Sequence, residues 1–310
     1  MDEFARIAAF FAPLAAEAGR GLGDDAAVLT PPPGRELVLT ADQMLEGVHF
    51  LTGDDPALIA RKLLRRNLSD LAAMGAVPLG YLLTTALPAA VPDSWLARFA
   101  EGLRMDQQRF GMELLGGDSS SARTDISLTA TLIGHVGPGQ ALPRKGARGG
   151  DKIFVTGTIG DAALGLHVRL GKLADPTGLF TRRSVLPDPR LGLALAGVVS
   201  AAIDVSDGLI QDIGHICRQS GVGAVIMAAL VPASPQAASL GPDYLEMRLT
   251  GGDDYELVLA VPPENEAALR QACGDLPITE IGFFKPGTGV QVMGMDGAPL
   301  TLSTPGWKHF

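Results

Sequence analysis

Residues 137–150 read GPGQALPRKGARGG, a run of glycine, proline and basic residues with no apolar periodicity. This composition is typical of turns and connections rather than of helices or strands. The run divides the 310-residue chain into halves that each have the usual length of one domain. We therefore predict two domains, over residues 1–137 and 148–310.

Helix-like and strand-like segments are mixed on both sides of this junction. Before it, we expect helices over 3–18, 56–74 and 93–110, and strands over 36–40, 79–87 and 125–136. After it, we expect strands over 152–156, 255–261, 278–284 and 289–293, and helices over 161–170, 190–202, 207–219 and 264–273. Neither half alternates strictly between strand and helix, which favours an α+β fold over a doubly wound sheet.

Composition narrows the class of protein. Hydrophobic residues make up 46% of the chain, enough for buried cores, and the net charge of −9 argues against a nucleic-acid partner. The same charge argues against anionic membranes, and the apolar stretch 71–92 is interrupted by glycine and proline, so no membrane span is expected. The acidic start has no signal-peptide pattern, and Cys217 and Cys273 lack metal-site spacing, so we expect a cytoplasmic protein.

Aspartate recurs at turns that contain small residues. A single such aspartate is more often a turn former or a helix N-cap than a ligand. Six of these turns in one acidic chain favour a site for a hard cation, because carboxylate oxygens without histidine or cysteine suit Mg²⁺. The turns contain Gly23-Asp24-Asp25, Thr40-Ala41-Asp42, Ser69-Asp70, Gly116-Gly117-Asp118, Asp204-Val205-Ser206-Asp207-Gly208 and Gly251-Gly252-Asp253-Asp254.

Several common active-site signatures are missing from the sequence. It has no GxxxxGK[ST] phosphate loop, no HRD and DFG pair, no HExxH and no GxSxG. The loop 155–161 follows an expected strand and opens an expected helix, so it fits either a phosphate cradle or a plain strand-to-helix turn.

The chain resembles the thiamine-monophosphate kinase family, which belongs with aminoimidazole ribonucleotide synthetase and selenophosphate synthetase. The similarity runs from about residue 3 to Phe310, and its short motifs are specific through their order and spacing. They are Gly23-Asp-Asp-Ala-Ala27, Asp42 with Glu46-Gly-Val-His-Phe50, Asn67-Leu-Ser-Asp-Leu-Ala-Ala-Met-Gly-Ala76, Gly116-Gly-Asp118, Val155-Thr-Gly157, Asp204-Val-Ser-Asp-Gly-Leu209 and Gly251-Gly-Asp-Asp-Tyr-Glu-Leu257.

This resemblance implies a two-domain α+β fold of the aminoimidazole ribonucleotide synthetase type. The N-terminal domain would carry a mixed sheet that pairs in a homodimer and would bind metal and ATP. The C-terminal α/β-sandwich domain would complete the nucleotide and substrate site. The implied reaction is ATP-dependent phosphorylation of thiamine monophosphate to thiamine diphosphate by direct in-line transfer, with several Mg²⁺ ions.

The resemblance also assigns residues by motif position. Metal positions are Asp25, Thr40, Ala41 (through its backbone), Asp42, Asp70, Asp118, Asp204 and Asp207. Nucleotide positions are Gly117, Asp118, Arg144 and Ser206, and substrate positions are His49, Asp253 and Trp307. Asp42, Asp70, Asp118 and Arg144 would act in catalysis. Asp253 stands where the family more often has glutamate, which is one methylene longer.

Phosphate chemistry agrees with this assignment. Two phosphate charges 4 Å apart repel by about 4 kcal/mol at an effective dielectric constant of 20, so joining two such groups requires clustered cations. An ionised phosphate acceptor needs no general base, which fits the missing catalytic-loop motif. Two alternatives stay open: a ring-closing or selenophosphate-forming enzyme of the same superfamily, and a non-enzymatic divalent-metal-binding module. Selenophosphate formation is disfavoured because the first cysteine is Cys217.

Overall fold

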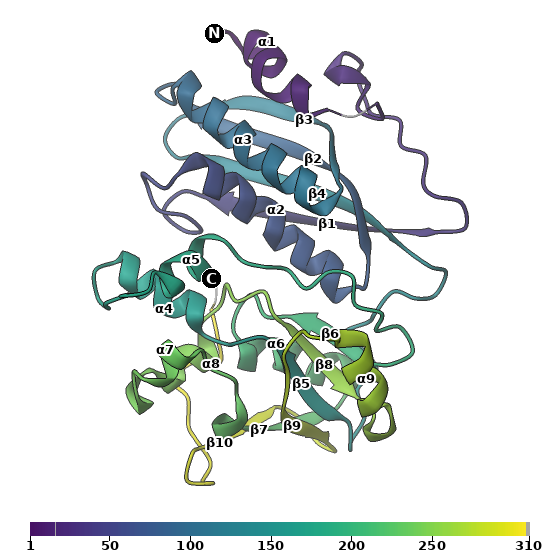
Figure 1. Ribbon diagram of the computed structural model, residues 1–310, viewed down its shortest axis with the longest axis vertical. Helices are drawn as coiled ribbons and strands as arrows, with labels where there is room; N and C mark the ends of the chain where they lie inside the picture. Colours follow the sequence, from purple (N-terminus) through teal and green to yellow (C-terminus); the bar gives the residue numbers. More distant parts are fainter. Residues whose placement is uncertain (16, 308–310) are drawn as a thin grey trace. The chain divides into compact units, whose positions relative to one another are not determined.

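A computed structural model describes residues 1–15 and 17–307 (Figure 1). The chain divides into an N-terminal unit, residues 1–71 and 76–139, and a C-terminal unit, residues 72–75 and from Gln140 onward. In the described part of the chain, no helix is long and apolar enough to cross a membrane.

The N-terminal unit is built on a four-stranded mixed sheet in the order β1-β4-β2-β3. Strands β2 and β3 are parallel, and the other pairs are antiparallel. The strands are β1 (Glu36–Leu45), β2 (Val77–Pro88), β3 (Glu113–Ala122) and β4 (Ser127–Val136), and the two long helices are α2 (Pro56–Ala73) and α3 (Asp93–Phe110). This mixed sheet confirms the expected fold class for this half.

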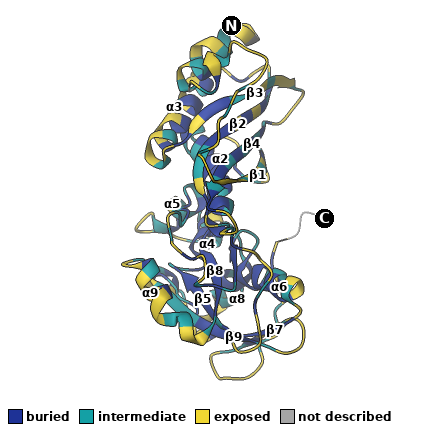
Figure 2. Cartoon of the chain, turned by 90° about the vertical axis from the view of Figure 1, so that its right-hand side faces the viewer, coloured by how far each residue is buried: buried dark blue, intermediate teal, exposed yellow. Residues whose placement is uncertain are grey.

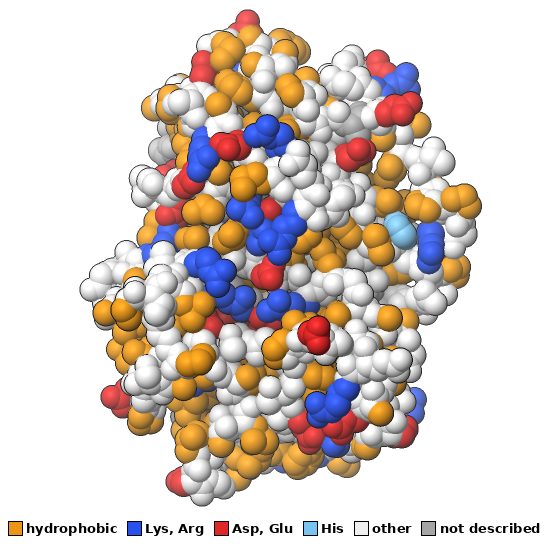
Figure 3. All heavy atoms as spheres, viewed as in Figure 1, with side chains coloured by type: hydrophobic (Ala, Val, Ile, Leu, Met, Phe, Trp, Pro, Cys, Tyr) orange, Lys and Arg blue, Asp and Glu red, His pale blue; other side chains and the backbone are white. Residues whose placement is uncertain are grey.

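The two long helices cover one face of this sheet (Figure 1). Burial alternates along β4, where Leu128, Ala130 and Leu132 are fully buried, as expected for a strand with one covered face. Figure 2 shows the central strands largely buried, whereas β1 keeps exposed positions. On the helix-covered side, basic and acidic side chains lie next to each other (Figure 3). Arg98 of α3 forms an ion pair of 2.8 Å with Asp55.

The first residues differ from the expected helix over 3–18. The structure has a short α1 (Glu3–Arg6), a π-helical turn (Ile7–Phe11) and a 3₁₀ turn (Ala12–Leu14). Pro13 lies in that last turn, and proline cannot donate the backbone hydrogen bond that would continue an α-helix. A further 3₁₀ turn, Arg20–Leu22, precedes β1.

The C-terminal unit is built on a six-stranded sheet in the order β10-β7-β9-β5-β8-β6. Its strands are β5 (Lys152–Thr156), β6 (Ala201–Asp204), β7 (Gly223–Met227), β8 (Leu257–Val261), β9 (Ile278–Lys285) and β10 (Val290–Met293). Its helices are α4 (Asp161–Arg169), α5 (Leu179–Val185), α6 (Leu209–Ser220), α7 (Pro235–Ala238), α8 (Leu245–Thr250) and α9 (Glu266–Cys273), with 3₁₀ turns at Ala228–Leu230, Pro242–Tyr244 and Pro263–Asn265.

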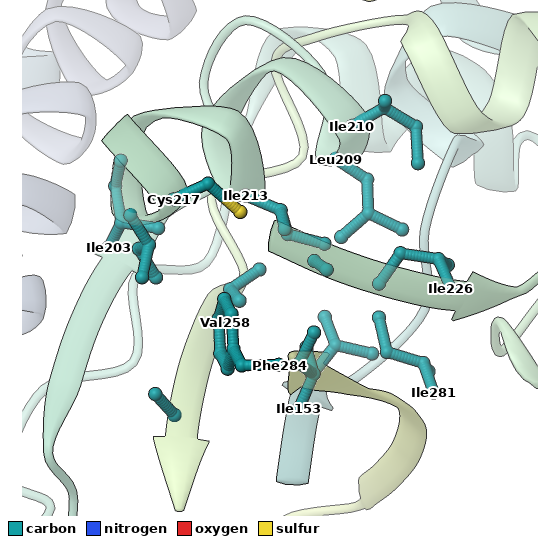
Figure 4. Close-up of a cluster of buried hydrophobic side chains, with 14 of the residues drawn as sticks. Ile153, Ile203, Leu209, Ile210, Ile213, Cys217, Ile226, Val258, Ile281 and Phe284 are labelled. Carbon is teal, nitrogen blue, oxygen red and sulfur yellow. The ribbon is translucent and has the colours of Figure 1, made fainter. Parts of the chain in front are cut away.

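Both faces of this sheet are covered, as expected for a sandwich of helices and strands. Ile153 and Val155 of β5 belong to a hydrophobic cluster with residues of α6 (Figure 4). Phe154, which points to the other face, belongs to a second cluster with Leu269 of α9. Strand β5 is therefore apolar at successive positions rather than at alternate ones.

The expected helix over 190–202 is wrong. The structure has turns there, followed by β6. Gly192 and Gly197 have φ angles of +80° and +77°, which an α-helix does not contain. The buried strand that follows pairs with β8 and ends at Asp204.

Candidate active site

Three predicted metal positions meet on the helix-covered face of the N-terminal sheet. The Thr40 hydroxyl on β1 donates a hydrogen bond of 2.5 Å to the carboxylate of Asp70 on α2. The Asp42 backbone amide donates to the side chain of Asn67 at 3.0 Å, and the Arg66 guanidinium lies 3.7 Å from the Asp42 carboxylate. Thr40 and Asp42 pair with buried residues of β4, which places both side chains on the helix side of the sheet.

Three other predicted positions line a cavity of about 570 Å³ in the same unit, namely Asp25, Gly117 and Asp118. Gly117 has a structural reason to be glycine, because a Cβ there would lie 1.7 Å from the backbone oxygen of Leu83. Asp118 pairs across the strands with the exposed Thr84, so it lies on the sheet face opposite to Thr40 and Asp42. The side chain of Ala41 is exposed.

His49 lies in the turn that follows β1. Its ring nitrogen Nδ1 accepts a hydrogen bond from the Leu45 amide at 3.0 Å, and its carbonyl accepts one from Lys62 at 3.2 Å. These bonds hold the predicted substrate histidine in a fixed turn of the N-terminal unit.

In the C-terminal unit, Asp204 ends β6, and the loop from β6 to α6 carries Ser206 and Asp207. One carboxylate oxygen of Asp212 accepts hydrogen bonds from the amides of Ser206, Asp207 and Gly208, each at 3.1 Å. Asp212 is 2% exposed, and its burial, together with the charges of Asp204 and Asp207, raises its pKa to about 8. This carboxylate fixes the backbone of the loop.

Sequence reasoning missed both Asp212 and His215. Ligand atoms of Asp207, Asp212 and His215 all lie within 4.8 Å of one another. The available signal was the spacing of Asp212 and His215, because residues three apart on one helix face the same side. Burial and the positive charges of Arg218 and Arg144 lower the pKa of His215, and Arg144 itself is exposed.

The predicted substrate residues of the C-terminal unit are hydrogen-bonded to the same loop. The Asp253 amide donates to the Ser206 carbonyl, and the Trp307 amide donates to the Asp207 carbonyl, both at 2.9 Å. The Trp307 carbonyl accepts a hydrogen bond of 2.8 Å from Gln211, and its side chain is 55% exposed. The structure therefore brings Ser206, Asp207, Asp253 and Trp307 together.

The loop 155–161 is not an open phosphate cradle. At the start of α4, the amides of Gly160 and Ala162 donate to the Asp254 carboxylate at 2.7 and 3.4 Å. Asp254 is 1% exposed, and burial raises its pKa to about 8. An internal carboxylate thus occupies the place that a phosphate would take.

Comparison with known proteins identifies the family. Residues 23–136 match the N-terminal domain of AIR synthase related proteins, and residues 148–294 match their C-terminal domain. The thiamine-monophosphate kinase of Caulobacter vibrioides is 40% identical to this chain over 99% of the chain and 90% of its own length.

Two solved structures are similar over most of the fold. Thiamine-monophosphate kinase from Stenotrophomonas maltophilia K279a matches with a TM-score of 0.82 at 40% identity, over 90% of this chain and 91% of that one. AaThiL, complexed with AMPPCP and TMP, matches with a TM-score of 0.80 at 32% identity, over 99% and 97%. These matches confirm the resemblance read from the motifs, and the chain belongs to the thiamine-monophosphate kinase family of AIR synthase related proteins.

Proposed function

We propose that the protein transfers the γ-phosphoryl group of ATP to thiamine monophosphate and so forms thiamine diphosphate. The observation that carries this proposal is the loop 204–208, whose carbonyls bind the amides of Asp253 and Trp307. One segment thereby holds metal, nucleotide and substrate positions next to one another. A relative with the same fold is complexed with AMPPCP and TMP, which supports this pair of reactants.

Several Mg²⁺ ions are part of this proposal, because the donor set fits them. Carboxylate and hydroxyl oxygens are the ligands that Mg²⁺ prefers, and it commonly shares them with substrate phosphates. The residues that would hold the ions are Asp25, Thr40, Asp42, Asp70, Asp118, Asp204 and Asp207, with Ala41 through its backbone. Bound Mg²⁺ would neutralise phosphate charge and polarise the γ-phosphoryl group.

The remaining residues would bind and orient the reactants. Arg144 is exposed and can hold a phosphate through its two-pronged guanidinium, while the Ser206 hydroxyl and the Gly117 backbone would contact the nucleotide. Trp307 offers an exposed ring for the pyrimidine or the cationic thiazolium, and Asp253 would supply a negative charge for the same substrate. The acceptor phosphate is already ionised, so alignment of donor and acceptor replaces proton abstraction.

A homodimer that forms through the N-terminal sheet is also proposed. The face opposite α2 and α3 exposes Leu37, Leu39, Val77 and Leu82, which is an apolar surface of the kind that a second chain covers. The N-terminal unit would then bind metal and ATP and form the dimer, and the C-terminal unit would complete the site. The two buried free thiols, Cys217 and Cys273, support a reducing compartment such as the cytoplasm.

The test is direct synthesis. Purified protein incubated with ATP, thiamine monophosphate and Mg²⁺ should give thiamine diphosphate and ADP in equal amounts, measured by chromatography. Addition of excess EDTA should abolish both products. Absence of thiamine diphosphate across a full titration of Mg²⁺ would refute the proposal, and ADP formed without it would point to another acceptor.

A further inference from the structure

The segment 251–256 has an unusual backbone. Asp253 and Tyr255 have φ angles of +70° and +53°, although neither is glycine. Such conformations are strained for residues with a side chain and persist only where the surroundings enforce them.

Backbone hydrogen bonds hold the segment 251–256 in this conformation. The Tyr255 amide donates to the Val205 carbonyl at 2.8 Å, alongside the bond from Asp253 to Ser206. On the other side, the buried side chain of Asp254 binds the amides at the start of α4. The backbone of Asp253 is therefore held by the loop 204–208 and, through its neighbour Asp254, by the start of α4.

Its side chain is held as well. The hydroxyl of Tyr255 donates a hydrogen bond of 3.0 Å to the Asp253 carboxylate, and Tyr255 is 2% exposed. A hydrogen bond to an ionised carboxylate is stronger than one between neutral groups, and a buried ring leaves the hydroxyl little freedom to move away. The hydroxyl of Tyr255 thus fixes the direction of the Asp253 carboxylate.

We propose that Tyr255 is a positioning residue for thiamine monophosphate, acting through Asp253; this inference rests on the proposed function. Aspartate is one methylene shorter than glutamate, so its carboxylate reaches less far and must point correctly to meet the cationic thiazolium or the aminopyrimidine. The hydrogen bond from Tyr255 selects that orientation before the substrate arrives, which reduces the ordering cost of binding. Tyr255 contributes to substrate affinity without touching the substrate.

Tyr255→Phe tests this inference, because it removes one oxygen and keeps the buried ring. We expect the KM for thiamine monophosphate to rise about tenfold, the size of one charge-assisted hydrogen bond. The KM for ATP and the melting temperature should stay close to those of the wild type. Tyr244→Phe is the matched control, because Tyr244 packs in a separate cluster around Phe180 and should leave both KM values unchanged.

A double-mutant cycle separates positioning from a general structural role. Asp253→Ala should by itself raise the KM for thiamine monophosphate, and adding Tyr255→Phe in that background should have no further effect. Equal effects in both backgrounds would overturn the inference, and so would an unchanged KM in the single variant. A Tyr255→Phe protein that fails to fold would also overturn it, since the hydroxyl would then serve the fold. Each effect is a ratio of the KM of a variant to that of the wild type. If the proposed function is wrong, the wild type itself forms no thiamine diphosphate, which distinguishes that failure from a failure of this inference.

Discussion

The hydroxyl of Thr40 donates a hydrogen bond to the carboxylate of Asp70, which ties the edge strand β1 to helix α2. Asp42 lies two residues further along the same face of β1. The bond consequently places two aspartates and a hydroxyl beside one another at the contact between strand and helix. This arrangement explains why motifs separated by about thirty residues in sequence belong to one predicted metal site.

Replacing Asp42 with asparagine should abolish most activity and preserve the fold. The amide keeps the size of the side chain but loses the charge that attracts a divalent cation, so we expect kcat to fall about a hundredfold or more. Product formation at saturating substrates and a thermal melt together measure this. Asp93→Asn is the control, since that carboxylate on α3 pairs with Arg6, which is not a predicted ligand. Unchanged turnover in Asp42→Asn would exclude Asp42 as a ligand.

The ion pair between Arg65 and Asp106 should be essential for stability rather than for catalysis. Two nitrogens of Arg65 bind Asp106 at 2.6 and 3.0 Å, and the side chains are 2% and 0% exposed. Asp106→Asn removes the carboxylate charge beside a buried guanidinium, so we expect a loss of about 3–5 kcal/mol in the free energy of unfolding. Urea unfolding measures the loss.

Glu101→Gln provides the comparison on the same helix. Glu101 pairs with Arg98 at the surface, where removal of an ion pair costs at most about 1 kcal/mol. Similar losses for the two variants would contradict the role assigned to burial.

A charge on the uncovered face of the N-terminal sheet should prevent dimerisation. Leu39 is 63% exposed, and lysine there would place a cation within the proposed interface, where its desolvation is costly. Sedimentation velocity should show a dimer for the wild type and a monomer for Leu39→Lys. Leu166→Lys, at an exposed position of α4 in the other unit, should remain dimeric. A monomeric wild type would reject the proposed interface.

The thiol of Cys217 should be almost inert in the folded protein. Burial raises its pKa to about 11. A thiol has to lose its proton to react, so at pH 8 only about one molecule in a thousand would carry the thiolate, against about a quarter for an ordinary cysteine. Alkylation of Cys217, followed by mass spectrometry, should be slow at pH 8, rise with pH, and become fast in denaturant. Fast reaction of the native protein at pH 8 would contradict this burial.

The elements predicted best from the sequence are those whose pattern is local. Helix α3 has the predicted bounds 93–110, and β5 has the predicted bounds 152–156. Strand β3 was not predicted, because its residues 116–121, GGDSSS, have little intrinsic preference for a strand. It forms through parallel pairing with β2, a contact between distant parts of the sequence.

Prediction of the candidate site from the sequence has the same limit, because local patterns do not reveal long-range contacts. The motifs predict which residues bind, but they do not reveal that Asp212 receives three amide hydrogen bonds or that Asp253 has a positive φ. The bonds to Asp212 require an exact turn of the loop just before it, and the Asp253 conformation depends on that loop packing against a segment that follows it by about fifty residues. Composition and spacing contain no direct signal for the contact between Asp253 and this distant loop.

Asp254 at the start of α4 has a consequence for engineering. Removing this carboxylate, for example with Asp254→Gly, would leave the amides of Gly160 and Ala162 without their acceptor. The start of α4 would then be an empty anion-binding site. Sulfate or inorganic phosphate should then raise the stability of the variant by binding to these amides. The same anions should not bind at the start of α4 in the natural protein. The start of α4 thus has the backbone geometry of an anion-binding site, which the Asp254 side chain occupies.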